Sequence, residues 1–194
     1  MNKRGFTLIE LLAVIVILGI LLAVAIPAVS QYINRSRKDS LVSEAKLYID
    51  SVRDDITAEM YPAPIGQNEA TIITLDKIKT EKKSDNRSPF GGKYLYNKSY
   101  VVVVNVGEGN DPEYKYYVAL QDSKDYAIPL TSEEELTRDK VVAKAKNKME
   151  VTIQALCGNP DGVTSSYAGL SGLDKSVGTV TATVFSSDKC GKND

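Results

Sequence analysis

Glu10 is the residue whose chemistry most needs explaining, because it is a lone acid at the leading edge of an apolar run from Leu11 to Val29. As a helix rising ~1.5 Å per residue, that run would reach about 28 Å, close to the thickness of a bilayer's hydrocarbon core. An acid at the centre of a membrane helix costs ~2.5–3.5 kcal/mol on insertion scales, and ionisable residues in such segments are rare, so a lone acid at the edge of the run indicates a function. The simpler alternative is that Glu10 only extends to the lipid headgroups. Lys3 and Arg4, just before it, favour a cytoplasmic N-terminus.

The common catalytic and metal-binding patterns do not occur in this sequence. It has no histidine, which is the commonest general base and a common zinc ligand, and its formal net charge is −1. It has no phosphate-binding loop, nucleophile elbow or zinc-ligand spacing. Two acidic segments, 108–111 and 159–162, hold oxygen ligands of the kind that calcium takes, but turn formation explains both. We therefore predict no enzymatic activity, no metal or cofactor, and no nucleic-acid partner.

Two conventional explanations exist for the N-terminal segment. A secretory signal peptide would be cut after a small-residue site such as 23–25 or 28–30, but the apolar run is longer than the usual 7–15 residues. A plain membrane anchor fits the length and the preceding positive charges. It leaves Glu10, Gly19 and Pro27 without an explanation.

A third explanation comes from a resemblance. The segment Gly5-Phe6-Thr7-Leu8-Ile9-Glu10-Leu11-Leu12 resembles the class III signal sequence of type IV pilins and their pseudopilin relatives. The resemblance implies that a prepilin peptidase cuts between Gly5 and Phe6, removes a leader of residues 1–5 and methylates the new amino group of Phe6. Glu10 then stands at the position of the family's glutamate.

The resemblance also implies how subunits assemble. The ammonium group exposed at Phe6 of one subunit would approach Glu10 of its neighbour in a helical stack. A buried carboxylate alone is strongly unfavourable and a paired one is tolerable, so the pair would favour the correct register. Gly19 and Pro27 weaken helix formation, and we expect the helix to bend or unwind between them during extraction from the membrane.

Beyond residue 30 the helix pattern continues with one apolar stripe. Its members follow each other at intervals of three or four residues, as expected of a helix that packs under a domain: Leu41, Ala45, Ile49, Val52, Ile56 and Met60. Pro62 ends the pattern. We predict a helix over 6–61, divided into a membrane and polymerisation half, 6–29, and an amphipathic half, 30–61.

The remaining residues, 62–194, are predicted to form a globular head. We expect a polar connection over 61–93 with a short helix at 75–82, and a Gly-, Ser- and Asp-rich loop over 158–178. β-Branched and aromatic residues predict strands at 94–96, 100–106, 113–120, 126–128, 151–156 and 180–185. Ser132 and Glu135 have capping-box spacing and predict an extra helix over 132–145. The predicted fold class is α+β, a long N-terminal helix packed on an antiparallel sheet.

Cys157 and Cys190 are the two cysteines of the chain. Outside the membrane an even pair favours a disulfide, worth roughly 3–4 kcal/mol by loop entropy. Two free buried thiols are the alternative. A loop closed between residues 157 and 190 would resemble the variable terminal loop of many pilins.

The resemblance implies a structural subunit of an extracellular pilus that serves adhesion, surface motility or biofilm formation, with no enzymatic activity. Its partners would be identical subunits, a prepilin peptidase, an assembly ATPase and a membrane platform protein, and we expect a Gram-positive-type system. The protein would be stored in the cytoplasmic membrane and then moved to the cell surface. Two alternatives stay open: a pseudopilin of a type II secretion or competence DNA-uptake system, and a secreted or anchored binding protein with a conventional signal.

Overall fold

The computed structural model describes most of the chain, as the following residue ranges: 7–78, 86–108, 111–124, 126–143, 157–158, 161–167 and 180–187. The chain divides into two compact units, Met1–Arg37 (unit 1) and Lys38–Asp194 (unit 2). One helix, α1 (Leu8–Thr57), contributes residues to both units. The long helix predicted from the sequence is therefore confirmed.

The C-terminal end of α1 comes four residues earlier than predicted. Glu59 adopts a left-handed conformation with φ of 58°, and the Met60 N–H donates to the Asp55 carbonyl at 2.8 Å. This pattern satisfies carbonyls that a helix end leaves unpaired. Met60 is 58% exposed, so its predicted place in the buried stripe is wrong.

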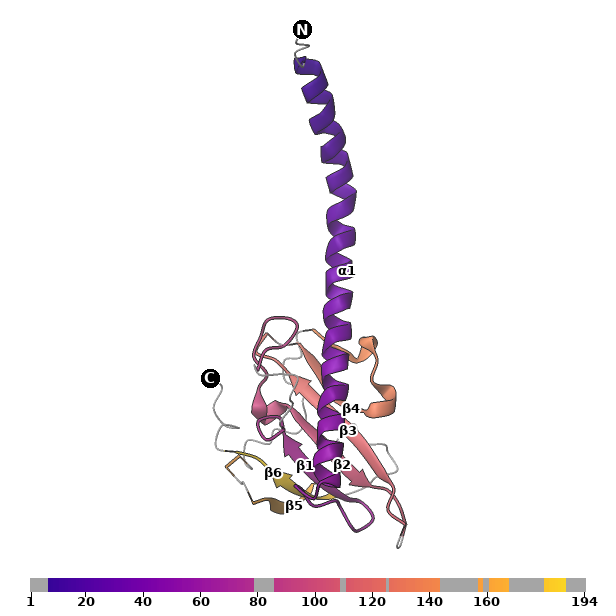
Figure 1. The fold of residues 1–194 in the computed structure, drawn as a ribbon, viewed down its shortest axis with the longest axis vertical. Coiled ribbons are helices and arrows are strands. Elements are labelled where there is room, and N and C mark those ends of the chain that lie inside the picture. Colours follow the sequence, from indigo (N-terminus) through magenta and orange to yellow (C-terminus); the bar gives the residue numbers. More distant parts are fainter. Residues whose placement is uncertain are drawn as a thin grey trace. The chain divides into compact units, whose positions relative to one another are not determined.

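Unit 2 is built on a six-stranded sheet with the order β4-β3-β2-β1-β6-β5 (Figure 1). Its strands are β1 (Glu69–Thr74), β2 (Tyr100–Asn105), β3 (Tyr114–Gln121), β4 (Ala127–Ser132), β5 (Val163–Tyr167) and β6 (Val180–Phe185). Neighbouring strands are antiparallel, except that β1 and β6 run parallel. The predicted α+β class and mostly antiparallel sheet are confirmed.

Both faces of the sheet are buried. On one face, the second half of α1 supplies the buried residues of the predicted stripe together with Tyr48; they pack against residues of the central strands such as Ile73, Val103 and Leu120. On the other face, Ile72, Val102 and Val184 belong to a second buried cluster. Successive residues of a strand point to opposite faces, so each central strand serves both clusters.

Strands β1 and β5 correct the prediction, because both lie in segments that we expected to be loops. Prolines and glycine at 62, 64 and 66 indicated a loop before β1, yet the strand itself carries four consecutive β-branched residues, Thr71–Thr74. At its centre, Ile72 pairs with Val102 of β2 and Val184 of β6. The expected short helix also does not start at residue 75, since residues 75–77 form a turn.

The extra helix predicted over 132–145 is wrong as well. In its place the structure has two short 3-10 helices, η2 (Glu133–Glu135) and η3 (Arg138–Lys140). The Ser132 side chain makes no capping hydrogen bond. Leu136 and Val141 are buried in the core, and Val142 forms a bridge with Ala127 at the start of β4. These contacts favour an extended path over a regular helix.

The other strand predictions have mixed outcomes. The hairpin β2–β3 and strand β6 lie where they were expected, and β4 is longer than the predicted strand at 126–128. The expected strand at 94–96 is replaced by a single bridge between Tyr94 and Asp122, followed by a 3-10 turn, η1 (Tyr96–Lys98). The strand predicted at 151–156 lies outside the described residues.

Candidate functional site

The N-terminus of α1 is closed by hydrogen bonds between Thr7 and Glu10. The Thr7 N–H and its hydroxyl both donate to Glu10 Oε2 at 2.8 Å, and the Glu10 N–H donates to Thr7 Oγ1 at 3.3 Å. This is a capping box, in which each of the two residues satisfies an amide that the first helical turn leaves unpaired. Sequence reasoning missed it, although the Thr-x-x-Glu spacing was present.

The capping box changes the interpretation of Glu10 from a lone acid to a partly satisfied one. Both donors from Thr7 go to Oε2, so Oε1 keeps its lone pairs for a further donor. Thr7 follows the predicted cleavage site between Gly5 and Phe6, so the capping box would be retained when the leader is removed. Gly5 and Phe6, the predicted processing residues, lie outside the described residues.

The rest of unit 1 exposes apolar side chains around the helix. The large apolar residues from Leu8 to Val29 are between 47% and 85% exposed. Within the described residues, α1 is the one helix long and apolar enough to cross a membrane by length and composition. An apolar surface of this extent on a soluble monomer is rare and marks an interaction with a membrane or with other chains.

Gly19 and Pro27 both lie inside the continuous helix. A Cβ atom added at Gly19 would meet nothing within 4 Å, so packing inside the chain does not require glycine there. Pro27 has no amide hydrogen and leaves the carbonyl of Ala23 without its usual helical donor. The helix is unbroken between them, and their expected role in loosening it stays a prediction.

In unit 2, the segment Glu133–Val142, here called the strap, is attached to α1 by charged groups. Arg138 donates to both carboxylate oxygens of Asp39 at 2.7 and 2.6 Å, and Lys38 donates to the Val141 carbonyl at 3.0 Å. Arg53 pairs with Glu133 at 2.6 Å. The hydrogen bond to Glu133 raises the pKa of the Arg53 guanidinium.

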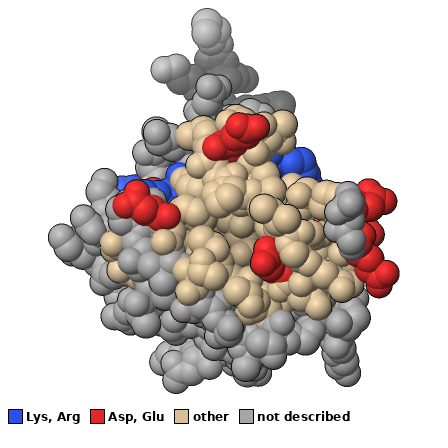
Figure 2. All heavy atoms as spheres, turned by 90° about the horizontal axis from the view of Figure 1, so that it is seen from below, with Lys and Arg blue, Asp and Glu red and all other residues tan. Residues whose placement is uncertain are grey.

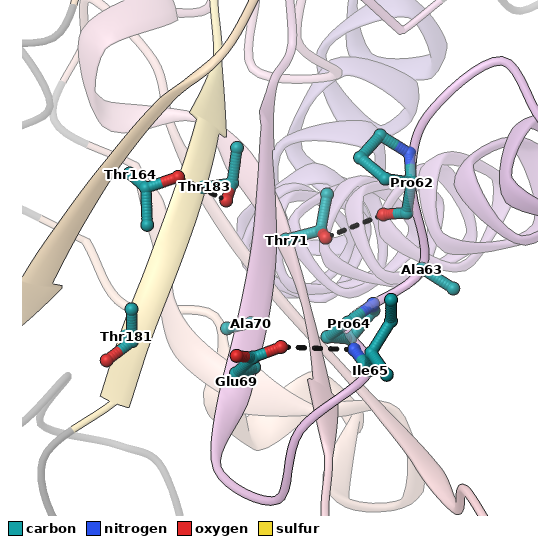
Figure 3. Close-up of a pocket in the computed structure, with 10 residues that line it drawn as sticks. All are labelled: Pro62, Ala63, Pro64, Ile65, Glu69, Ala70, Thr71, Thr164, Thr181 and Thr183. Atoms are coloured by element: carbon teal, nitrogen blue, oxygen red, sulfur yellow. Dashed lines mark hydrogen bonds between the residues drawn. The ribbon is translucent and has the colours of Figure 1, made fainter.

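The end of unit 2 at which α1 stops carries a pocket of about 260 Å³. Figure 3 shows its walls: the loop Pro62–Ile65 on one side, β1 in the middle, and threonines of β5 and β6 on the other. The described part of the face seen in Figure 2, from the same end of the head, is largely uncharged, with acidic groups more prominent than basic ones. Sequence reasoning did not find this pocket, because its walls come from segments about 100 residues apart.

The remaining predicted site residues fall partly outside the described residues. No group of three or more His, Cys, Asp or Glu residues that could hold a metal occurs among the described residues. Cys157 is described and Cys190 is not, so the disulfide stays a prediction. Half of each acidic segment that was considered for calcium, at 109–110 and 159–160, is likewise outside the described ranges.

Comparison with known proteins finds a family motif in the N-terminal region and partial similarity to several curated proteins. Residues 1–26 match the model of the prokaryotic N-terminal methylation motif. Fimbrial protein Q of Moraxella bovis is 52% identical over 42 residues, which are 22% of this chain and 27% of that protein. The type IV major fimbrial protein FimA of Dichelobacter nodosus gives the same figures. A fimbrial protein of Neisseria meningitidis serogroup B is 47% identical over 81 residues, 40% of this chain and 45% of that protein.

The chain therefore spans between about a quarter and a half of the length of these curated relatives. No solved structure matches it. The chain carries a prokaryotic N-terminal methylation motif, and over part of its length it is similar to type IV fimbrial proteins.

Proposed function

We propose that this chain is the structural subunit of an extracellular type IV pilus, with no enzymatic role. One observation carries the proposal: the methylation motif over residues 1–26 coincides with the helix segment whose apolar surface is exposed all round. Such a surface is unstable in water and is covered in two successive environments. The first is the bilayer, where the chain would wait as a single-pass prepilin, and the second is the core of a filament.

Processing would prepare the segment for the second environment. A prepilin peptidase would cut between Gly5 and Phe6, which removes the positive charges of Lys3 and Arg4 and creates an amine at Phe6. Glu10 would then have two tasks. Oε2 holds the first turn of α1 through Thr7, and Oε1 would accept the Phe6 ammonium of a neighbouring subunit. Together, the two contacts would satisfy a carboxylate that is otherwise costly to bury.

Three variants separate the two tasks of Glu10. Glu10→Gln keeps the capping box, since glutamine serves at that position, but removes the charge. Thr7→Val removes the box and keeps the charge, and Glu10→Ala removes both. We expect filaments at near-normal yield from Thr7→Val and at least about tenfold fewer from Glu10→Gln and Glu10→Ala, because a buried ammonium left unpaired is strongly unfavourable. Electron microscopy and sheared-filament yield measure this, and membrane fractionation checks that each variant is still inserted.

Normal filament yield from Glu10→Gln would refute the charge pairing and leave Glu10 with its capping role alone. Mass spectrometry of the mature N-terminus tests the proposal more broadly. A chain that begins with methylated Phe6 supports it, whereas a start near Ile26 or Gln31 would show a conventional signal and a secreted or anchored binding protein. Long filaments that persist when this chain is deleted would favour the pseudopilin alternative.

The proposal includes partners and features that the comparisons do not test. An assembly ATPase and a membrane platform protein would drive extraction, and Gly19 and Pro27 would let the helix yield during it. Cys157 and Cys190 would close the terminal loop of the head. The names of the relatives give no support to a Gram-positive-type system, and we do not carry that expectation further.

A further inference from the structure

The pocket at the end of α1 is slightly smaller than a typical small-molecule site. Its volume is about 260 Å³, just below the ~300–1,000 Å³ of pockets that hold drug-sized ligands. A ligand of one ring is the match in size. The walls come from three strands and the loop Pro62–Ile65, so folding of the whole of unit 2 is needed to bring them together.

Glu69 is fixed in one orientation at the rim of this pocket (Figure 3). Its Oε2 accepts the Gly66 N–H at 2.8 Å and the Ile65 N–H at 3.2 Å. The side chain folds back so closely over Gly66 that a Cβ atom there would lie 2.9 Å from it. Both backbone donors reach the same oxygen, which leaves Oε1 of an exposed carboxylate as an acceptor held in advance.

Threonine hydroxyl groups of β5 and β6 line the side of the pocket away from the loop Pro62–Ile65. Thr181 and Thr183 alternate along β6 with Ala182 and Val184, which are buried on the other face, so both threonines point to the pocket side. The hydroxyls of Thr183 and Thr164 on β5 are 2.9 Å apart. Each hydroxyl is both donor and acceptor. The pocket therefore presents several neutral groups that serve either role and one anionic acceptor.

From this chemistry we propose that the pocket binds one uncharged sugar ring. Neighbouring hydroxyls of a sugar would donate to Glu69 Oε1 and exchange hydrogen bonds with Thr181 and Thr183. Its apolar C–H face would rest on the prolines of the loop and on Ile65, which is 84% exposed. The carboxylate, together with the acidic groups on this face (Figure 2), disfavours phosphates and acidic sugars.

The same ring can come from two sources, a free monosaccharide or the terminal unit of a polysaccharide. The pocket lies in unit 2, and its ligand binding does not depend on filament assembly. Failure of this proposal would therefore leave the proposed pilus function intact, and a chain that never forms filaments could still bind the sugar.

The test uses the full chain in a zwitterionic detergent without a sugar headgroup. Saturation-transfer NMR screens a panel of neutral methyl hexosides, and titration gives the dissociation constant, for which we expect about 1 mM. Immobilised polysaccharides that end in the same sugar distinguish the second source. If only the free glycoside binds, the ligand is a monosaccharide. If the polymer also retains the protein, the terminal unit of a glycan is recognised.

Two variants locate the binding. Glu69→Gln keeps an acceptor for the Gly66 N–H and replaces the other oxygen by a donor, and Thr181→Val removes one hydroxyl without changing side-chain shape. We expect each to weaken binding about tenfold, because each removes one direct hydrogen bond. Glu134→Gln, an exposed acid in η2, is the matched control and should bind as the native chain does. Thermal unfolding checks that all three variants fold.

The absence of saturation transfer from every hexoside would overturn the proposal. Binding that survives in both Glu69→Gln and Thr181→Val would overturn it too, since the sugar would then sit elsewhere. Preferential binding of methylammonium over every hexoside would reassign the pocket to a cationic ligand and refute the sugar.

Discussion

The two halves of α1 belong to one helix but differ in whether their apolar side chains are exposed or buried. Up to Val29 the helix is apolar on every side, and its large side chains are about half exposed or more. From Lys38 on, only one stripe is apolar, and residues such as Ile49 and Val52 are fully buried under the sheet. The most apolar part of the chain is thus the least buried within it.

The difference shows that a fully apolar helix surface is not explained by the fold of its own chain. An amphipathic helix needs one partner face, and unit 2 supplies it through the sheet. A helix that is apolar on every side must be surrounded by apolar groups, which only lipid or other chains provide. This contrast separates residues that stabilise the subunit from residues that would serve assembly.

The largest expected effect comes from comparing an isoleucine-to-alanine substitution in the buried half of α1 with the same substitution in its exposed half. Ile49→Ala leaves a cavity under the sheet and should lower the free energy of unfolding of unit 2 by about 2–5 kcal/mol. Ile17→Ala removes the same atoms from an exposed site, 57% accessible, and should leave that free energy unchanged. Denaturant unfolding followed by tyrosine absorbance suits the comparison, because all tyrosines except Tyr32 belong to unit 2.

Filament yield gives the reverse comparison. Under the proposed function, Ile17→Ala reduces filament yield from a fully folded subunit, whereas Ile49→Ala acts through lost folded protein. An equal loss of stability from the two substitutions would contradict the division of α1 that we describe.

Local sequence patterns predicted the parts of the fold whose partners are near in the chain. The stripe on α1 and the hairpin β2–β3 needed only a helical period and two β-branched runs around a turn. Strand β1 was missed because the prolines and glycine at 62, 64 and 66 indicated a loop, and its pairing with β6 gives no local signal that would have corrected this. Ile72 pairs with Val184, and no local pattern shows a partner more than a hundred residues distant.

The two Ser/Thr-x-x-Glu patterns show the same limit at the level of a site. Thr7 and Glu10 form the capping box, because nothing else in the described structure competes for that helix end. Ser132 and Glu135 have the same spacing and form no box, since burial of Leu136 and Val141 holds the strap in another conformation. Tertiary packing decides which of two equal local signals is used.

A second prediction concerns Tyr94, which contacts the buried half of α1. Its hydroxyl donates to Glu44 at 2.5 Å, and its ring meets Tyr48 edge to face at 6.2 Å. Burial, with the nearby Glu44 charge second, raises the pKa of the Tyr94 phenol well above its ordinary value of 10.0. At alkaline pH the folded state therefore keeps the phenol proton of Tyr94, whereas the unfolded state loses it.

The raised pKa makes the stabilising contribution of Tyr94 complete below pH 10 and progressively lost above it. Each further pH unit should cost about 1.4 kcal/mol for this phenol. Tyr94→Phe should reduce the alkaline slope of unfolding free energy by that amount, as measured by denaturant unfolding between pH 9 and 11.5. An unchanged slope in Tyr94→Phe would mean that the phenol ionises without unfolding, and that this contact with α1 is not closed to water.

The smallest expected effect concerns the strap. Arg53 on α1 pairs with Glu133 at 2.6 Å, with side chains 39% and 35% exposed, and its guanidinium lies 4.6 Å from the centre of the Tyr116 ring. Partly exposed ion pairs contribute about 0.2–1 kcal/mol and are weakened by salt. Glu133→Gln should therefore lower the unfolding free energy of unit 2 by no more than about 1 kcal/mol at low salt, and by less at 1 M salt.

Glu134→Gln is the control for this substitution, because it removes the same charge from the same 3-10 helix at an exposed position without a cation beside it in the described structure. A comparison at two salt concentrations separates the pair from the general effect of net charge. If both substitutions have the same salt dependence, the ion pair adds nothing specific. The strap would then be held to α1 by its buried leucine and valine and by the contacts of Lys38 and Asp39.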